Sequence, residues 1–148
     1  MRSPKAMCML YYLGTDADVA LSPAWSEEAP AFYVSRPSDD ELAKLRGKLP
    51  HKHIIHLGSH EGCGCGFRRL YDGVFVPQDE EEEKRTRADH MGLVAFLSAL
   101  PTSTRANQIF GCWSGDEAEP ARFFRDCGPA DFGADDFAFQ ERELITLR

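Results

Sequence analysis

The segment QDEEEEKRTRADHMGLVAFLSALP, residues 78–101, constrains the fold most, because it predicts one long helix. Its acidic start favours the positive end of a helix dipole, and basic residues follow at helical spacing. Three i,i+4 pairs run in the favourable orientation: Glu80 with Lys84, Glu81 with Arg85 and Glu83 with Arg87. Apolar side chains then recur on one face of the helix, namely Met91, Val94, Leu97 and Leu100. Pro101 ends the helix.

Four other segments are typical of β-strands because they are rich in β-branched and aromatic residues. They are AMCMLYYLG at 6–14, AFYVSR at 31–36, HKHIIHLG at 51–58 and NQIFGCW at 107–113. The first is apolar at successive positions, which predicts a central strand that is buried on both faces. The tail DFAFQERELITLR predicts one bulged strand or a hairpin.

A second, shorter helix is predicted in SDDELAKLRGKLP, residues 38–50. Ser38 and Glu41 have the spacing of a capping box, in which each side chain satisfies a backbone N–H of the other. The apolar side chains of this helix lie on one face and are Leu42, Leu45 and Leu49. Gly47 and Pro50 end the helix.

The order of elements is therefore β-β-α-β-α-β-β, which predicts an α+β fold with a mixed sheet of about five strands and two helices. We expect one globular domain over residues 1–148, with residues 1–6 as a flexible N-terminal extension. Each predicted helix joins successive strands, which favours right-handed parallel crossovers, while the outer strands pair antiparallel.

The composition is that of a folded, acidic protein. Apolar residues make up 43% of the chain, charged residues 28%, and the formal net charge is −7. Scattered Lys and Arg residues form no basic stripe, which argues against nucleic acid and against an anionic membrane surface as partners. The partners expected instead are a metal ion, a small molecule or another protein, with a homodimer as the default assembly.

The cysteine content favours a reducing compartment. Five cysteines are an odd number, without the density of a secreted disulfide scaffold. The start MRSPKAMCMLYYLG has some features of a signal peptide, but its apolar run is short and no good cleavage region follows. No apolar stretch approaches membrane-spanning length. We therefore expect a soluble, cytoplasmic protein.

Three predicted strands end alike, in apolar residues, then glycine, then small or polar groups. The segments are YYLGTD, IHLGSH and IFGCWSGD. If the three strands lie side by side, their C-terminal ends form one rim, where open α/β sheets bind ligands. Glycine at strand ends is also common in plain turns. The other rim candidates are Thr15, Ser59, Trp113 and Asp116.

The segment HLGSHEGCGCGF, residues 56–67, concentrates side chains that bind soft metals. His56, His60, Cys63 and Cys65 are candidate ligands for Zn²⁺ or Cu⁺, and the intervening glycines allow a tight loop. Structural zinc sites usually use two separated pairs of cysteines, whereas this loop has a single C-x-C. A complete site would therefore need Cys8, Cys112 or a histidine from a neighbouring strand.

Two other interpretations of the loop stay open. Cys63 or Cys65 could be the nucleophile of an enzyme, with His56 or His60 as base and Asp116 to orient the histidine. Alternatively, the glycines only shape a turn, the cysteines are small buried hydrophobic residues, and the protein is an interaction module. Three histidines outside the loop have simpler explanations: His51 and His53 at the surface of a strand entrance, and His90 solvated on the long helix.

The segments MCMLYYLGTD and LGSHEGCGCGF resemble a family of small bacterial proteins of uncharacterised function. The likeness extends through GCWSGD and the strand-rich tail. It implies a compact bacterial domain that begins at the Met-Cys pair, with MRSPKA as an added extension. The resemblance implies no activity, substrate or cofactor.

Overall fold

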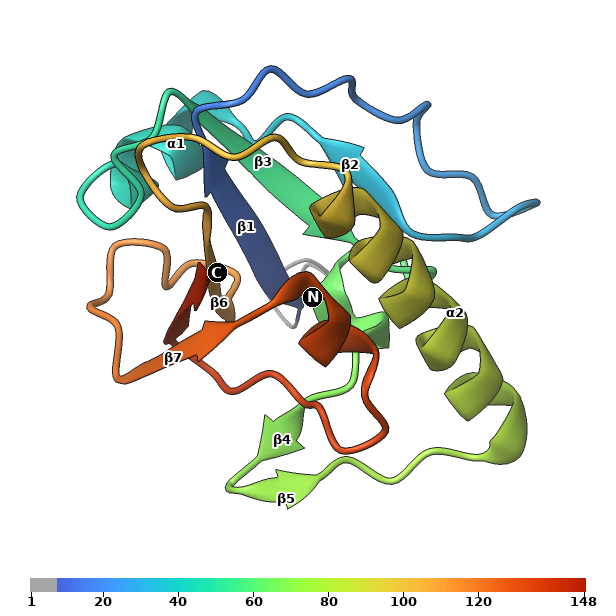
Figure 1. Ribbon diagram of the computed structural model, residues 1–148. Coiled ribbons are helices and arrows are strands. Elements are labelled where there is room, and N and C mark those ends of the chain that lie inside the picture. Colours follow the sequence, from blue (N-terminus) through green and yellow to red (C-terminus); the bar gives the residue numbers. More distant parts are fainter. Residues whose placement is uncertain (1–7) are drawn as a thin grey trace.

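The computed structural model describes residues 8–148, and its centre is a mixed six-stranded sheet (Figure 1). The predicted extension at residues 1–6 lies outside the described residues. The strands follow the order β2-β3-β1-β6-β8-β7, and every neighbouring pair is antiparallel except β7 with β8. The strands are β1 (Met9–Thr15), β2 (Tyr33–Ser35), β3 (His53–Gly58), β6 (Gln108–Trp113), β7 (Phe123–Cys127) and β8 (Glu143–Leu147).

Two α-helices and several short elements complete the fold. The helices are α1 (Asp39–Leu45) and α2 (Glu80–Ser98). Short 3₁₀ helices are η2 (Gly64–Gly66) and η3 (Pro129–Gly133), and a separate hairpin is formed by β4 (Leu70–Tyr71) and β5 (Val74–Phe75). The predicted α+β class is confirmed. The described residues contain β7 and the hairpin in addition to the strands that were expected.

The first predicted strand is the core of the sheet, as its composition indicated. All seven residues of β1 are buried, because β3 and β6 flank it and both of its faces are covered. Met9, Tyr11 and Leu13 pack on the side of α2 and η3, while Leu10 and Tyr12 pack on the side of α1. The alternation of side chains along a strand thus divides the core into two layers.

The prediction of parallel crossovers is wrong for α1 and only partly correct for α2. β2 and β3, which α1 joins, pair antiparallel. β3 and β6, which α2 joins, point in the same direction, but β1 lies between them and is antiparallel to both. Strand direction depends on pairing between distant segments, and the local pattern around each helix does not specify it.

Most of the local helix signals are confirmed. Ser38 and Glu41 form the predicted capping box at the start of α1. Two of the three ion pairs predicted in α2 form among the described residues: Arg85 pairs with Glu81 at 3.7 Å, and Arg87 pairs with Glu83 at 3.4 Å.

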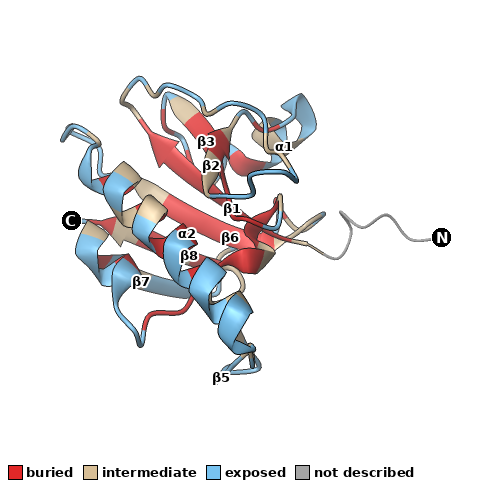
Figure 2. Ribbon diagram, turned by 90° about the vertical axis from the view of Figure 1, so that its right-hand side faces the viewer, coloured by how far each residue is buried: buried red, intermediate tan, exposed pale blue. Residues whose placement is uncertain are grey.

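The buried stripe of α2 differs from the predicted apolar face. Met91 is 57% exposed, whereas the stripe that faces the protein includes polar residues (Figure 2). The buried residues of the helix are Thr86, Asp89, His90, Leu93 and Leu97. Hydrogen bonds to neighbouring loops allow the polar members to replace apolar side chains on the inner face.

Two histidines that we expected at the surface are buried. The His51 ring lies 2.8 Å from the Ala106 carbonyl oxygen, measured from Nε2. His90 accepts the Arg68 backbone N–H at Nε2, at 2.8 Å, so its proton lies on Nδ1, which donates to the Phe132 carbonyl at 2.7 Å. Burial lowers the pKa of His90 to about 4, and the ring is neutral at pH 7.

Among residues 8–148, no helix combines the length and the apolar character that crossing a bilayer requires.

Candidate functional site

The loop at residues 59–66 follows β3, includes η2 and is held by buried hydrogen bonds. The Ser59 hydroxyl donates to the Cys63 carbonyl at 2.6 Å and accepts the Gly66 N–H at 2.9 Å. From outside the loop, the Tyr33 hydroxyl donates to the Gly62 carbonyl at 2.6 Å. Ser59, which we expected to line a ligand rim, therefore has a structural role within the loop.

Glycines are required where the loop turns and where it meets β1. Gly62 has a φ of +81°, in the left-handed region that L side chains rarely adopt. A Cβ atom on Gly64 would lie 2.4 Å from the Tyr11 ring and 2.6 Å from the Met9 carbonyl oxygen. The close approach of loop and strand therefore depends on the absence of a side chain at residue 64.

Three cysteines meet where this loop passes the start of β1. The sulfur atoms of Cys8, Cys63 and Cys65 all lie within 4.8 Å of one another, and we call these residues the thiol cluster. The Met9 N–H donates to the Cys65 sulfur at 3.3 Å, and the Cys65 N–H donates to the Cys63 sulfur at 3.5 Å. Two segments that are far apart in the sequence thus supply three candidate ligands at one point.

The pKa values of the two cysteines of the loop are shifted in opposite directions. A hydrogen bond from the Cys63 thiol lowers the pKa of Cys65 to about 6, and the Met9 N–H and the Arg69 guanidinium also favour its thiolate. The same hydrogen bond, together with burial, raises the pKa of Cys63. This hydrogen bond therefore favours the thiolate form at Cys65 and the thiol form at Cys63.

A pocket of about 430 Å³ opens beside the thiol cluster, and Cys8 and Cys63 form part of its wall. His56 also lines this pocket, with its Nδ1 atom 3.2 Å from the Ser35 hydroxyl. The other side chains on the wall include two aromatic rings and two carboxylates: Trp25, Tyr33, Glu41 and Glu61. The pocket gives a small solute a path to two of the three sulfurs.

His60 is directed toward α2 and binds carboxylates there. Its Nδ1 atom lies 2.5 Å from the Asp89 carboxylate, and its Nε2 atom lies 2.9 Å from Glu82. Burial acts to lower the pKa of His60, but the Asp89, Glu82 and Glu61 carboxylates outweigh it, and the pKa is raised. Burial also raises the pKa of Asp89. His60 therefore has a full set of partners outside the thiol cluster.

Cys112, which we considered as an outside ligand, is not a member of the thiol cluster. It is fully buried on β6, where it pairs with Leu10 in the layer of the core next to α1. Burial raises the pKa of its thiol, which favours the protonated form. Cys112 is therefore a packing residue, as its apolar surroundings in the sequence also suggested.

The expected rim is only partly formed, because β1 runs antiparallel to β3 and β6. Thr15, at the end of β1, pairs with His53 at the start of β3. This pair lies at the opposite end of the strands from the glycine-rich loop, which follows β3. Trp113 pairs with Met9 and, together with Asp116, lies at the end of the sheet where the loop is found. Trp113 lines a different pocket from the one beside the thiol cluster.

Some residues of interest were missed in the sequence. Asp89 and Glu82 hold His60, but a polar side chain in a helix gives no local sign of such a long-range contact. Asp72 and Gly73 form the turn of the β4–β5 hairpin, and an Asp-Gly pair between Tyr71 and Val74 is the sequence signal for such a hairpin. Comparisons with protein-family models, curated proteins and solved structures give no match for this chain.

Proposed function

We propose that this protein binds one thiophilic metal ion, Zn²⁺ or Cu⁺, through Cys8, Cys63 and Cys65. The observation that carries the proposal is the convergence of the three sulfurs within 4.8 Å of one another. An ion bonded to each sulfur at about 2.3 Å would hold them roughly 4 Å apart, so small side-chain movements would complete the coordination. Thiolate ligands select Cu⁺ and Zn²⁺ over hard cations.

The surroundings of the thiol cluster support a site that exchanges its ion with solvent. Cys8 and Cys63 line the pocket of about 430 Å³, which provides an entry path. The Met9 backbone N–H donates a hydrogen bond to the Cys65 sulfur and helps to hold it in position. Three protein ligands leave a position for water or a small ligand, as in zinc sites that are not purely structural.

His60 is not placed to act as the base of a cysteine nucleophile, because it bonds carboxylates through both of its ring nitrogens. A general base must lie within hydrogen-bonding reach of the thiol that it activates. A measurement of metal binding distinguishes the two functions, because an enzyme that uses a cysteine nucleophile needs no bound ion.

The test is a titration of untagged, reduced protein with Zn²⁺ and with Cu⁺, each in competition with a chromophoric chelator. We expect one ion per chain, and an affinity more than about 100-fold weaker in Cys65→Ser, since even outer-shell partners of a metal contribute about 10- to 100-fold. Cys127→Ser is the matched control, because Cys127 is a buried thiol on β7 outside the thiol cluster. Failure of the wild type to bind either ion, or equal binding by Cys65→Ser, would refute the proposal.

A further inference from the structure

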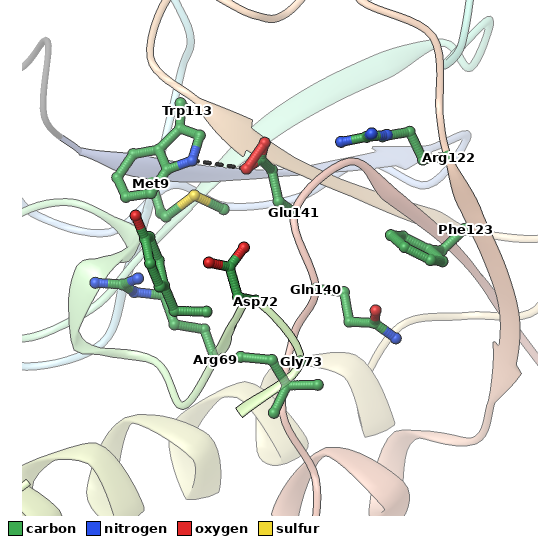
Figure 3. A pocket seen from close by; sticks show the side chains of 11 residues that line it. Met9, Arg69, Asp72, Gly73, Trp113, Arg122, Phe123, Gln140 and Glu141 are labelled. Atoms are coloured by element: carbon green, nitrogen blue, oxygen red, sulfur yellow. Dashed lines mark hydrogen bonds between the residues drawn. The ribbon is translucent and has the colours of Figure 1, made fainter. Parts of the chain in front are cut away.

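A second cavity, of about 490 Å³, lies at the base of the β4–β5 hairpin (Figure 3). Its walls come from the hairpin, the end of β6 and the segments that precede β7 and β8. The volume falls in the range of about 300–1,000 Å³ that is usual for small-molecule sites. None of the three cysteines of the thiol cluster lines this cavity.

Two opposite charges face this cavity without neutralising each other. Asp72 and Arg122 both line it, and Figure 3 shows the carboxylate and the guanidinium directed into the same space. Within residues 8–148, neither side chain forms an ion pair or a hydrogen bond. Glu141 and Arg69 also line the cavity, but Glu141 accepts the Trp113 indole N–H and Arg69 lies over the Trp113 ring. Asp72 and Arg122 are therefore the pair of opposite charges that are available to a ligand.

The backbone at both residues is held by local structure. Asp72 and Gly73 have φ values of 51° and 79°, as in the tight I′ turns that join two-residue hairpins. The Arg122 backbone N–H donates to the Arg142 carbonyl at 2.7 Å. The chain segments that carry the two exposed charges are therefore ordered before a ligand binds, which reduces the entropy lost on binding.

Aromatic side chains supply the apolar part of the cavity. The Trp113 indole N–H donates to Glu141 at 2.9 Å, which fixes the orientation of the ring (Figure 3). Phe123 lines the cavity and is 45% exposed. The Arg69 guanidinium lies 5.5 Å from the centre of the Trp113 ring, in a cation–π contact. Aromatic surfaces of this kind favour a planar, apolar group on the ligand.

We propose that this cavity binds a zwitterionic α-amino acid with an aromatic side chain. Arg122 receives the carboxylate, Asp72 receives the ammonium group, and the side chain packs on Trp113 and Phe123. A ligand with only one charge would leave one protein charge partly desolvated and unpaired, and a neutral ligand would leave both, which is costly. The proposal is independent of metal binding.

The test is a calorimetric titration of the full chain with four probes that share one ring. These are phenylalanine, phenethylamine with only the ammonium, 3-phenylpropionate with only the carboxylate, and neutral N-acetylphenylalanine amide. We expect phenylalanine to bind at least about tenfold more tightly than each of the others, since one hydrogen bond to a charged group contributes about that much.

Two variants assign the charges separately. Arg122→Gln should abolish the preference for phenylalanine over phenethylamine, and Asp72→Asn should abolish its preference over 3-phenylpropionate. Asparagine tolerates the positive φ of residue 72, so the turn is kept. Arg85→Gln, on the exposed surface of α2, is the matched control and should bind as the wild type does. Absence of phenylalanine binding, or binding no tighter than that of the neutral amide, would overturn the proposal.

Discussion

His60 and Asp89 form a buried pair that fastens the loop of the thiol cluster to helix α2. One Asp89 carboxylate oxygen lies 2.5 Å from His60 Nδ1, and the other accepts the His60 backbone N–H at 3.0 Å. The side chains are 4% and 1% exposed, respectively. Because the same loop carries Cys63 and Cys65, the long helix sets the position of two of the three thiols.

Removal of Asp89 should destabilise the protein strongly. Asp89→Ala leaves His60 buried without its principal carboxylate, and breaking a buried ion pair costs about 3–5 kcal/mol. The free energy of unfolding, measured in urea, should fall by about this amount. Glu81→Ala removes an exposed carboxylate on the same helix and should change it by less than about 1 kcal/mol. Comparable losses in the two variants would contradict the proposed importance of the buried pair.

His90 should make the protein sensitive to acid. Its folded pKa of about 4 lies below its ordinary value of 6.5, so the unfolded chain binds more protons. Its contribution to stability is therefore complete above about pH 6.5 and is lost as the pH falls toward 4, by about 3 kcal/mol in total. Urea unfolding of wild type and His90→Gln across this range isolates the effect. Stability curves that stay parallel would show that His90 does not titrate in this way.

Gly64 should tolerate no side chain. In Gly64→Ala the new Cβ meets the Tyr11 ring and the Met9 carbonyl, and overpacking of this kind costs about 1–3 kcal/mol. Gly47→Ala is a matched control, because a Cβ there has no heavy atom within 4 Å, so this variant should be neutral or slightly more stable. Thermal unfolding of both variants provides the measurement. An unchanged melting temperature in Gly64→Ala would mean that the loop can move away from β1.

Tyr11 and Tyr33 should respond in opposite ways to loss of the hydroxyl group. The Tyr11 hydroxyl is buried and has no hydrogen-bond partner among the described residues. Tyr11→Phe should therefore leave the free energy of unfolding unchanged or raise it by about 1 kcal/mol. The Tyr33 hydroxyl donates to the Gly62 carbonyl, so Tyr33→Phe should lose about 1 kcal/mol. Chemical denaturation of the two variants tests the pair. A loss in Tyr11→Phe would point to a polar partner for that hydroxyl.

Features that depend on nearby residues could be predicted from the sequence. The capping box of Ser38 and Glu41 and the extent of α2 follow from spacings within one or two helical turns. The buried character of β1 follows from its composition. These signals are local, so a single segment contains all the information that they need.

Features that depend on distant pairing could not be predicted. The antiparallel direction of β1 separates Thr15 from the glycine-rich loop and brings Cys8 to that loop. The contact with Asp89, which directs His60 to α2, also joins segments far apart in the sequence. For the candidate site, the sequence therefore indicated the two cysteines of the loop as candidates but not that Cys8 converges with them.

The position of Cys8 next to β1 has a consequence for the order of events during synthesis. Cys8 is synthesised before β2, α1 and β3, and it approaches Cys63 and Cys65 only after β3 pairs with β1. Closure of so long a chain segment has an entropic cost that an ion bound to all three sulfurs would offset. Capture of metal would therefore mark the moment at which this half of the sheet is assembled.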